Sequence, residues 1–567
     1  MVRRAGRASA RPAKHGAPVL VELFGANRQI ACASVFLYSK SMSARASRQA
    51  TLWDDLSAPD VALNRPTDSA YWRGSMISRM QSRCERRDLG QYMTPPLIAR
   101  LMARRMVEAR QWADCTVRLL DPAAGSGVLA SALVEAVATA SAPPARIELL
   151  LCEIDPAMQP ALLRCADELR NFCASLHVDI DVQTCQGDFL LGTLACDAQP
   201  VLDAVIANPP YFKLARNDPR ALAHDAAVHG QPNIYGLFMT ACAAILRPGG
   251  AYCFITPRSW TNGAYFRAAR RILRTTIAID ALHLFDSRQA HFEADEILQE
   301  ALITWGTANG RQGDVRVSTS HGTADLDADV PTPWPAQQVL GASPNSAIVV
   351  PRRNARNAAL DHWPLRLADL GLRVVTGPVV GFRAREYLRR SVEARSVPML
   401  WMPHVQRSHI DWPRGHRAEY IDLNADSQWM LLPNEPAVVL RRFSPKEDVR
   451  RVTAAAYVAD LPGERIGFEN HLNVILGIGE PLSRHVALGL AAWLNCHAID
   501  TYLRERLGST QVNAVELREL PVPDLSALES LGRSLPLLPE LLEIDSLTSA
   551  LVQALPAPGI FKRARAA

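Results

Sequence analysis

The chain has 567 residues, 48% of them apolar and 21% charged, and a formal net charge of +5. This length exceeds what one hydrophobic core usually supports, so we expect two folded domains rather than a small disulfide-stapled module. No apolar run reaches the roughly 20 residues that a membrane span requires, and the modest charge does not by itself indicate a nucleic-acid partner. The eleven cysteines include no Cys-x-x-Cys pair, which favours reduced thiols in a cytosol and predicts no metal site.

Residues 1–50 form a distinct basic segment, with nine Lys or Arg and a single acid, Glu22. We expect a disordered arm. A transit peptide and a DNA-contacting tail are the alternatives, because both are rich in Arg and poor in acids. Met42 opens a stretch that leads into the folded part, which makes it a candidate translation start.

Residues 51–310 are predicted to form one α/β domain. Short apolar runs alternate there with longer amphipathic segments, a pattern typical of a mostly parallel sheet covered by helices on both faces. The expected strands are 117–120, 147–152, 178–182, 201–207, 251–256, 277–284 and 297–305. The clearest expected helices are 128–140, 157–173 and 235–246. Ligands of such sheets bind at the carboxyl ends of the strands.

The pattern changes beyond residue 310. Residues 311–350 are polar and rich in Gly, Pro, Asp and Ser, which predicts a linker. Residues 351–540 are predicted to form a second domain of mixed α+β structure, followed by a C-terminal tail over 541–567. The elements expected here are strands at 372–376, 437–440 and 472–476, a helix at 485–507, and helices within the Leu-rich segment 525–555.

Acidic residues follow three successive strands of the first domain. Asp121 opens the turn Asp121-Pro122-Ala123-Ala124-Gly125-Ser126-Gly127, Glu153 and Ile154 end the second strand, and Asp188 and Phe189 follow the third. The glycines let the backbone pass closely by a ligand, although a tight structural turn is the alternative. A dinucleotide is disfavoured, because Gly-x-Gly-x-x-Gly is missing and an acid would repel a pyrophosphate. S-adenosylmethionine fits better: its cationic methionine end would lie near Asp121, its ribose near Glu153, and its adenine near Asp188 and Phe189.

Asn208-Pro209-Pro210-Tyr211 follows the buried strand at 201–207. The two prolines fix the backbone, so the Asn208 side-chain oxygen and the Pro209 carbonyl can both point at one amino group. Two acceptors on a planar amine free its lone pair for attack on a methyl sulfonium, and Tyr211 can stack on the ring that carries the amine. The alternative is a rigid proline turn.

With these motifs in this order, the sequence resembles the amino-methylating DNA methyltransferases, in particular the adenine-N6 enzymes of bacterial type II restriction-modification systems with a C-terminal target-recognition domain. The resemblance covers about residues 88–305 and implies a Rossmann-like methyltransferase fold with a mostly parallel, seven-stranded sheet. Residues 90–96 match the family's N-terminal cofactor motif. The implied catalytic residues are Asn208, Pro209, Pro210 and Tyr211, and the implied cofactor-binding residues are Tyr92, Thr94, Pro95, Asp121, Ala123, Gly125, Gly127, Glu153, Ile154, Asp188, Phe189 and Asn208.

The resemblance also implies an aromatic residue that faces Tyr211 across the substrate base. Phe292, in the segment His291-Phe292-Glu293-Ala294-Asp295, is the first candidate and Phe285 the second. Residues 351–540 would then be the target-recognition domain, and its first fifty residues hold ten Arg against four acids, a balance suited to phosphate contact. The individual candidates for DNA contact are Arg383, Arg385, Arg441, Arg442, Gln511 and Asn513, with the segments 401–412 and 441–451 as further candidates.

The expected activity is therefore site-specific methylation of adenine N6 in double-stranded DNA, by a cytoplasmic and monomeric bacterial enzyme that protects DNA from a separate endonuclease. Cytosine-C5 methylation is disfavoured because no cysteine follows a proline. Cytosine-N4 methylation is an alternative, although its tetrapeptide usually begins with Ser or Thr. Methylation of protein glutamine is a second alternative that shares the tetrapeptide but not the long C-terminal region, and a DNA-binding subunit without activity is a third.

Overall fold

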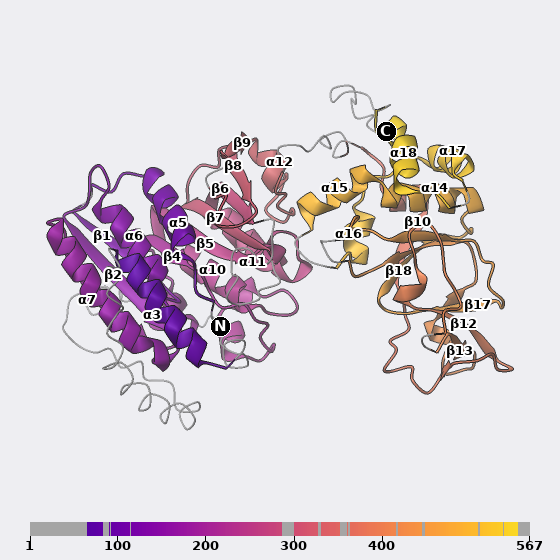
Figure 1. The fold of residues 1–567 in the computed structure, drawn as a ribbon, viewed down its shortest axis with the longest axis horizontal. Coiled ribbons are helices and arrows are strands. Elements are labelled where there is room, and N and C mark those ends of the chain that lie inside the picture. Colours follow the sequence, from indigo (N-terminus) through magenta and orange to yellow (C-terminus); the bar gives the residue numbers. More distant parts are fainter. Residues whose placement is uncertain are drawn as a thin grey trace, which may run out of the picture.

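The computed structural model describes residues 65–82, 90, 92–113, 115–285, 300–326, 330–351, 360, 363–415, 418–444, 448–507, 511–536 and 538–553. These residues form two lobes that lie side by side (Figure 1). The expected basic arm, residues 1–50, and the segment that contains Phe292 lie outside the described residues. Within the described part of the chain, no helix is both long and apolar enough to cross a membrane.

A nine-stranded sheet forms the centre of the first lobe, which we call the catalytic lobe. Its strand order is β3-β2-β1-β4-β5-β7-β6-β8-β9. The strands are β1 Thr116–Asp121, β2 Arg146–Glu153, β3 Asp179–Gln186, β4 Leu202–Ala207, β5 Leu246–Pro257, β6 Ile277–Phe285, β7 Ala301–Ala308, β8 Val315–Ser320 and β9 Thr332–Trp334. Strands β1 to β5 pair in parallel and β7 runs antiparallel between β5 and β6, so the expectation of a mostly parallel sheet is confirmed.

Two of these strands correct the sequence interpretation. The sheet has nine strands where seven were expected, and residues 311–350 are not a simple linker, because they contribute β8, β9 and the short helix α12 (Ala336–Leu340). Strand β8 pairs in parallel with β6 and buries Val315 and Val317 against the sheet's apolar layer. The polar composition that predicts a linker is therefore compatible with edge strands, where half of the surface faces water.

Helices cover both faces of this sheet and bury two apolar clusters. Side chains of α3 (Pro66–Met80), α5 (Pro96–Glu108), α6 (Val128–Ala138) and α7 (Gln159–Ser175) contribute to clusters on one face. Helices α10 (Ile234–Ala244) and α11 (Arg267–Thr276), with the short α8 (Thr193–Asp197) and α9 (Pro219–Ala223), pack on the other face. This three-layer arrangement brings the ends of β1, β2, β3 and β4 to one edge, which is where the acidic residues and the Asn-Pro-Pro-Tyr turn lie.

The second lobe, which we call the C-terminal lobe, contains two smaller sheets, with strand orders β10-β18-β15-β16 and β11-β13-β12-β17-β14. The strands are β10 Leu372–Thr376, β11 Leu388–Arg389, β12 Ser396–Leu400, β13 Tyr420–Asp422, β14 Leu431–Pro433, β15 Ala437–Arg441, β16 Ala454–Tyr457, β17 Arg465–Phe468 and β18 Leu472–Gly477. The helices are α14 Arg484–Asn495, α15 His497–Arg506, α16 Ala514–Arg518, α17 Leu525–Ser534 and α18 Leu541–Gln553.

The single helix expected over 485–507 is divided into α14 and α15 at Cys496, whose backbone is extended. A tertiary contact explains the break: the Asn495 side chain pairs with both backbone groups of Ala454 on β16, at 2.8 and 3.1 Å, and so holds the end of α14. The expected tail also begins with structure, because α18 packs its Ile544 and Thr548 into the lobe.

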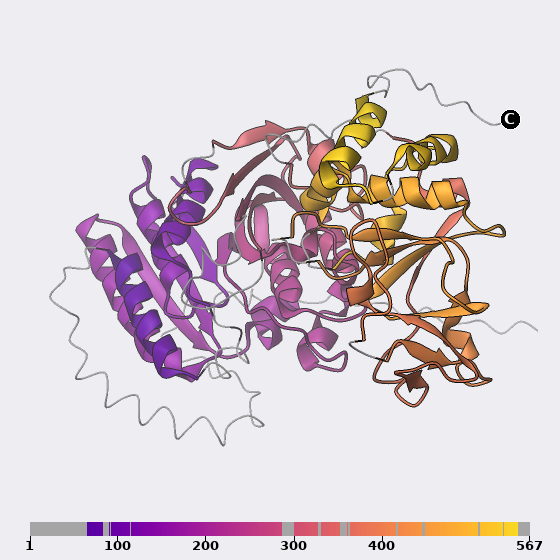
Figure 2. The ribbon, with the colours of Figure 1, turned by 45° about the vertical axis from the view of Figure 1, so that its right-hand side comes forward.

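The lobes are joined by a buried arginine at the end of β5. Arg258 is fully buried and donates to the backbone oxygens of Arg504, at 3.0 Å, and Glu505, at the carboxyl end of α15. It also forms a buried ion pair with Glu300, at 3.3 Å. A cation at this end of a helix satisfies its last carbonyls and complements its dipole. Figures 1 and 2 both show the yellow C-terminal helices beside the pink end of the catalytic lobe.

Arg258→Ala should lower the free energy of unfolding by about 3–5 kcal/mol, because it leaves Glu300 buried without its partner. Urea unfolding followed by tryptophan fluorescence measures this. Arg267→Ala is the matched control, since Arg267 is exposed on the same lobe. An unchanged midpoint for Arg258→Ala would show that the contact contributes nothing to the junction.

Candidate functional site

The turn after β1 needs its two glycines. Gly125 and Gly127 have φ of 54° and 91°, in the left-handed region that residues with a side chain rarely adopt. A Cβ on Gly127 would lie 2.5 Å from Cys165 Sγ, inside van der Waals contact. Asp121, at the end of β1, is 1% exposed and its Oδ1 accepts from the Ala123 N–H at 3.3 Å. The turn therefore brings its backbone close to the carboxyl end of the sheet.

Glu153 links this turn to the end of the neighbouring strand. Its Oε2 accepts from the Gly125 N–H at 2.7 Å and its Oε1 from the Asp155 N–H at 2.8 Å. Beside it, the apolar side chain of Ile154 is left 47% exposed. Glu153 thus shapes both turns, a role that its position after a strand does not reveal.

Asp121 lies close enough to Glu153 for that carboxylate to affect the ionisation of Asp121. Burial raises the pKa of Asp121 to about 7, and the neighbouring Glu153 carboxylate adds to the rise, while the Ala123 N–H opposes it. Two buried acids that repel each other form a favourable site for a positively charged ligand group.

The third expected acid, Asp188, lies just after the end of β3. It accepts from the Leu190 N–H at 3.0 Å and lies 3.7 Å from Arg220 Nη1. Burial raises its pKa, and Arg220 partly offsets the rise. Phe189 is buried and stacks on Phe238, with ring centroids 5.6 Å apart, so its ring belongs to the apolar layer under the site.

The Asn208 amide connects the end of β4 to the N-terminal motif. Its Nδ2 donates to the Tyr92 carbonyl and to Thr94 Oγ1, both at 3.0 Å. Gly90, with φ of 61°, packs so closely that a Cβ there would lie 2.9 Å from the Tyr211 nitrogen. Pro95 follows Thr94 in the sequence and directly precedes the first residue of α5. The fold therefore brings Asn208 to Tyr92 and Thr94, although more than a hundred residues separate Asn208 from each of them.

Tyr211 occupies the remaining side of Asn208. Its hydroxyl donates to Asn208 Oδ1 and lies 3.0 Å from the Ile255 carbonyl oxygen on β5. Its ring stacks on Tyr92 at 5.9 Å and meets the edge of Tyr235 at 6.0 Å. Burial raises the pKa of Tyr211, so the hydroxyl stays protonated at neutral pH. The amide oxygen that was expected to face a substrate amine is thus held by Tyr211, which the sequence did not indicate.

The residues expected to contact DNA lie in the C-terminal lobe, and two of them bind each other. Arg442 donates to Asn513 Oδ1 at 3.1 Å, and Arg441 donates to the Val405 carbonyl at 2.7 Å. Arg383 and Arg385 are exposed, and Gln511 forms a backbone bridge with Phe443. Phe285, the second candidate for the aromatic opposite Tyr211, is fully buried and packs edge-on against His283.

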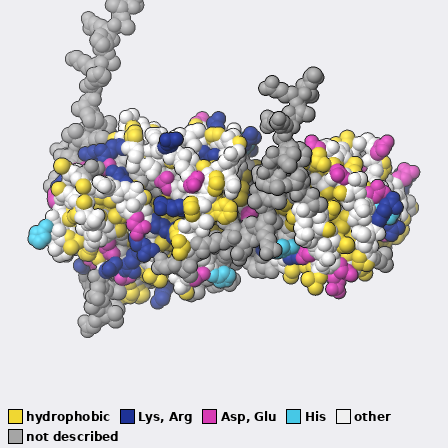
Figure 3. Space-filling model, turned by 90° about the horizontal axis from the view of Figure 1, so that it is seen from above, with side chains coloured by type: hydrophobic (Ala, Val, Ile, Leu, Met, Phe, Trp, Pro, Cys, Tyr) yellow, Lys and Arg dark blue, Asp and Glu magenta, His cyan; other side chains and the backbone are white. Residues whose placement is uncertain are grey.

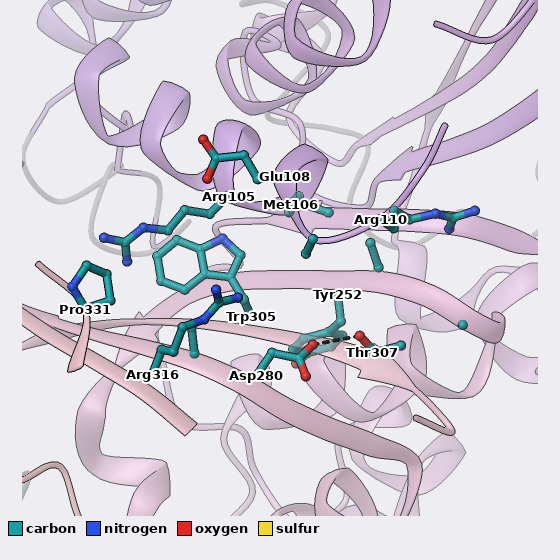
Figure 4. Close-up of a pocket in the computed structure, with 15 residues that line it drawn as sticks. Arg105, Met106, Glu108, Arg110, Tyr252, Asp280, Trp305, Thr307, Arg316 and Pro331 are labelled. Atoms are coloured by element: carbon teal, nitrogen blue, oxygen red, sulfur yellow. Dashed lines mark hydrogen bonds between the residues drawn. The ribbon is translucent and has the colours of Figure 1, made fainter. Parts of the chain in front are cut away.

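A cavity of about 280 Å³ lies apart from this site (Figure 4). It is lined by the first half of β5, at Gly249 and Ala251, whereas Ile255 at the other end of that strand meets Tyr211. Within it, the Arg105 guanidinium lies 5.0 Å from the centre of the Trp305 ring. The candidate site is therefore the carboxyl edge of the sheet and not this cavity.

The shifted pKa of Asp121 predicts a pH-dependent stability. Because the folded protein holds this proton up to about pH 7, against an ordinary pKa of 3.8, its contribution to stability is present at low pH and is lost as pH rises from about 4 to 7. The free energy of unfolding of Asp121→Asn, taken relative to that of the wild type, should therefore rise between about pH 4 and 7. Above pH 7 the difference should stay constant. Thermal unfolding at pH 5, 6, 7 and 8 measures this, and a constant difference between pH 5 and 7 would contradict the shift.

Comparison with known proteins identifies the family to which this chain is similar. The family described as Eco57I restriction-modification methylase matches residues 184–292. The type II methyltransferase M.PstI of Providencia stuartii is 31% identical over 461 residues, which is 79% of this chain and 89% of that protein. The type II methyltransferase M.BsuBI of Bacillus subtilis is 31% identical over 463 residues, 79% of this chain and 90% of that protein.

A likeness of fold alone relates the chain to a solved structure of the type IIL restriction-modification enzyme MmeI in complex with DNA. The TM-score is 0.53 at 12% identity, and the match covers 90% of this chain and 81% of that one. Both lobes are therefore included in the likeness. From the two relatives above, which align over most of their length, the chain belongs to the type II methyltransferases of restriction-modification systems.

Proposed function

We propose that the protein transfers a methyl group from S-adenosylmethionine to the N6 amine of an adenine in duplex DNA, at a specific site. The observation that carries this proposal is the orientation of Asn208: its amide nitrogen is held by Tyr92 and Thr94, so its oxygen faces Tyr211 beside the acidic turn. Membership of the type II methyltransferases supports methyl transfer in a restriction-modification system, in which a separate endonuclease would cut the unmodified site.

The residues at the strand ends fit S-adenosylmethionine. The buried pair Asp121 and Glu153 favours a cation, and the cofactor's methionine end carries an ammonium group. An added Cβ on Gly187 would meet no heavy atom within 4 Å, so there is space beyond β3. When bound, the cofactor supplies an electrophilic methyl group on a sulfonium.

Each position in the cofactor site has a role in this proposal. Asp121 would hold the methionine ammonium and Glu153 the ribose hydroxyls, while the exposed Ile154 would pack on the adenine, and Asp188 would accept from its amine. The residues that would cover or shape the methionine end are Tyr92, Thr94, Pro95, Ala123, Gly125 and Gly127.

The substrate base must leave the duplex to reach this edge of the sheet. Asn208 Oδ1 and the Pro209 carbonyl would accept the two N6 hydrogens and leave the nitrogen lone pair free for direct attack, without a covalent intermediate on the protein. Pro210 would fix the turn, and the Tyr211 ring would stack on the base, with Phe292 as the proposed partner on its other side. For this to happen, the Tyr211 hydroxyl has to release Asn208 Oδ1.

Adenine is favoured over cytosine because the tetrapeptide begins with Asn. Two alternative targets could be methylated by the same chemistry: the N4 amine of cytosine and the side-chain amide of protein glutamine. Protein-glutamine methyltransferases lack a long C-terminal region, so the C-terminal lobe, proposed as the target-recognition domain, argues against a protein substrate. Arg383 and Arg385 are its exposed candidates for DNA contact. We propose that the protein acts as a monomer in the bacterial cytosol.

Asn208→Ala should lower methyl transfer by about two to three orders of magnitude, because it removes a pre-oriented acceptor, while cofactor binding stays within a few-fold of the wild type. The measurement uses labelled S-adenosylmethionine with unmethylated bacterial DNA, digestion to nucleosides and mass spectrometry. N6-methyladenine supports the proposal. N4-methylcytosine would show that cytosine, and not adenine, is the target base. Label found only in protein would refute a DNA substrate.

Tyr211→Phe and Tyr211→Ala separate the hydroxyl from the ring. The Phe variant keeps the ring that stacks on the base and frees Asn208 Oδ1, so its turnover should stay within a few-fold of the wild type. The Ala variant should lose about tenfold to a hundredfold, since stacking on a base is worth about 1–3 kcal/mol. Single-turnover methylation of a DNA duplex measures both rates. Equal losses in the two variants would show that the hydroxyl, and not the ring, is required.

A further inference from the structure

The segment from residue 402 to 415, between β12 and β13, forms a rigid loop on the C-terminal lobe. Val405 and Ile410 pair as a short antiparallel bridge, and the Asp411 N–H donates to the His404 carbonyl at 2.8 Å. The Ser408 N–H donates to the Ala454 carbonyl at 2.9 Å, which fixes the tip of the loop to β16. Val405 is fully buried in the apolar cluster below.

Two arginines brace this loop by binding its backbone. Arg441, from β15, donates to the Val405 carbonyl at 2.7 Å and to Gln406 Oε1 at 3.2 Å. Arg414 donates to the Pro403 carbonyl at 3.0 Å and forms an ion pair with Asp411 at 3.4 Å. Both guanidinium groups therefore have partners.

Three donors of the same loop have none. Arg407 Nε, Ser408 Oγ and Trp412 Nε1 are buried, and no acceptor among the described residues receives a hydrogen bond from them. Leaving a buried donor without a partner costs about 1–3 kcal/mol each. Ser408 adds a left-handed backbone, with φ of 71°. Local strain of this kind is found most often at active sites and ligand-binding loops.

Positive charge is concentrated at the same place. Burial lowers the pKa of Arg441, and the neighbouring Arg414 and Arg407 lower it further, while Asp448 opposes them. The Arg441 guanidinium therefore lies within the field of both Arg414 and Arg407, and the buried Nε of Arg407 has no acceptor among the described residues. Figure 3 shows one face of this lobe, on which acidic and basic side chains are mixed, so this face is not broadly basic.

We propose that the loop binds a phosphodiester group of the DNA backbone, with Arg407 as the contacting side chain and Arg414 and Arg441 as positioning residues that hold the loop. This inference rests on duplex DNA being the substrate. A phosphate carries a negative charge and several acceptor oxygens, so it can pair with the Arg407 guanidinium and offset the positive charge that Arg407 and Arg414 place near Arg441. The contact would set the position of the C-terminal lobe on the duplex.

The test measures binding of full-length protein to fluorescently labelled duplexes by anisotropy, over a range of KCl concentrations. Arg407→Ala should weaken binding about equally for a duplex with the methylated site and for a scrambled duplex. It should also reduce the slope of log affinity against log salt by about 1, as expected when one phosphate contact is lost. Arg533→Ala is the control, because Arg533 is 62% exposed and pairs with Glu529 on α17.

Two results would overturn the assignment. Unchanged affinity and salt slope for Arg407→Ala would exclude a DNA contact, and a loss confined to the methylated site at unchanged slope would make Arg407 a reader of base edges instead. Asn208→Ala separates this inference from the proposed function, since it should keep DNA binding and salt slope while losing methyl transfer. If the wild type binds no duplex, the DNA substrate itself is wrong.

Thermal unfolding gives an independent readout. Arg407→Ala should leave the unfolding midpoint unchanged or raise it, because the buried Nε has no partner among the described residues to lose. Arg441→Ala should lower the midpoint by removing two hydrogen bonds of the loop. A lowered midpoint for Arg407→Ala would show a structural role and count against the proposal.

Discussion

The Asn208 amide has one nitrogen with two hydrogens, and both are bound. One hydrogen points to the backbone of Tyr92 and the other to the Thr94 hydroxyl, so the amide cannot turn over without losing two bonds. The oxygen is left facing the Tyr211 side of the turn. The N-terminal motif, proposed to cover the cofactor, therefore also decides which atom of Asn208 faces the proposed substrate side. In the proposed function, the proline turn after β4 can present an acceptor next to the acidic turn after β1 only when Asn208 has this orientation.

Residues of β5 and the residue just after it contact both this site and the second lobe. Its Ile255 carbonyl lies beside the Tyr211 hydroxyl, and three residues later Arg258 binds the end of α15. The residues after α15 lead to Asn513, which binds Arg442 on the C-terminal lobe. Contacts at Ile255 and Arg258 thus connect the proposed substrate turn to the end of α15 in the lobe proposed to read DNA.

The alternation of apolar runs and amphipathic segments was sufficient to predict the catalytic lobe, because strands buried on both faces have to be apolar throughout. Asp121, Glu153 and Asn208 could be placed on one edge of the sheet for the same reason. Other features depend on contacts that no local pattern contains. The break at Cys496 follows from Asn495 meeting Ala454, and β8 and β9 form on polar sequence because β6 offers an edge to pair with.

Side-chain pairings were the least predictable. Arg442 and Asn513 each have the chemistry to read a base, yet they bind one another across 71 positions of the chain. Conversely, Arg407 is one arginine among many in the sequence, and only the fold shows that its buried Nε has no partner among the described residues. Residue type indicates what a side chain can bind, and the fold decides whether another part of the protein has already bound it.

The position of β8 and β9 has a consequence for how recognition regions could be exchanged between relatives. A chimera cut near residue 311 would remove two strands from the catalytic sheet and expose the edge of β6 to pairing with other chains. A cut after Val350 would keep the sheet whole, but Val350 donates to the Glu505 carbonyl, so the incoming lobe would need a helix end that accepts from both Val350 and Arg258. In a C-terminal lobe that reads DNA as proposed, new specificities are therefore most easily introduced within the lobe, on a retained α15.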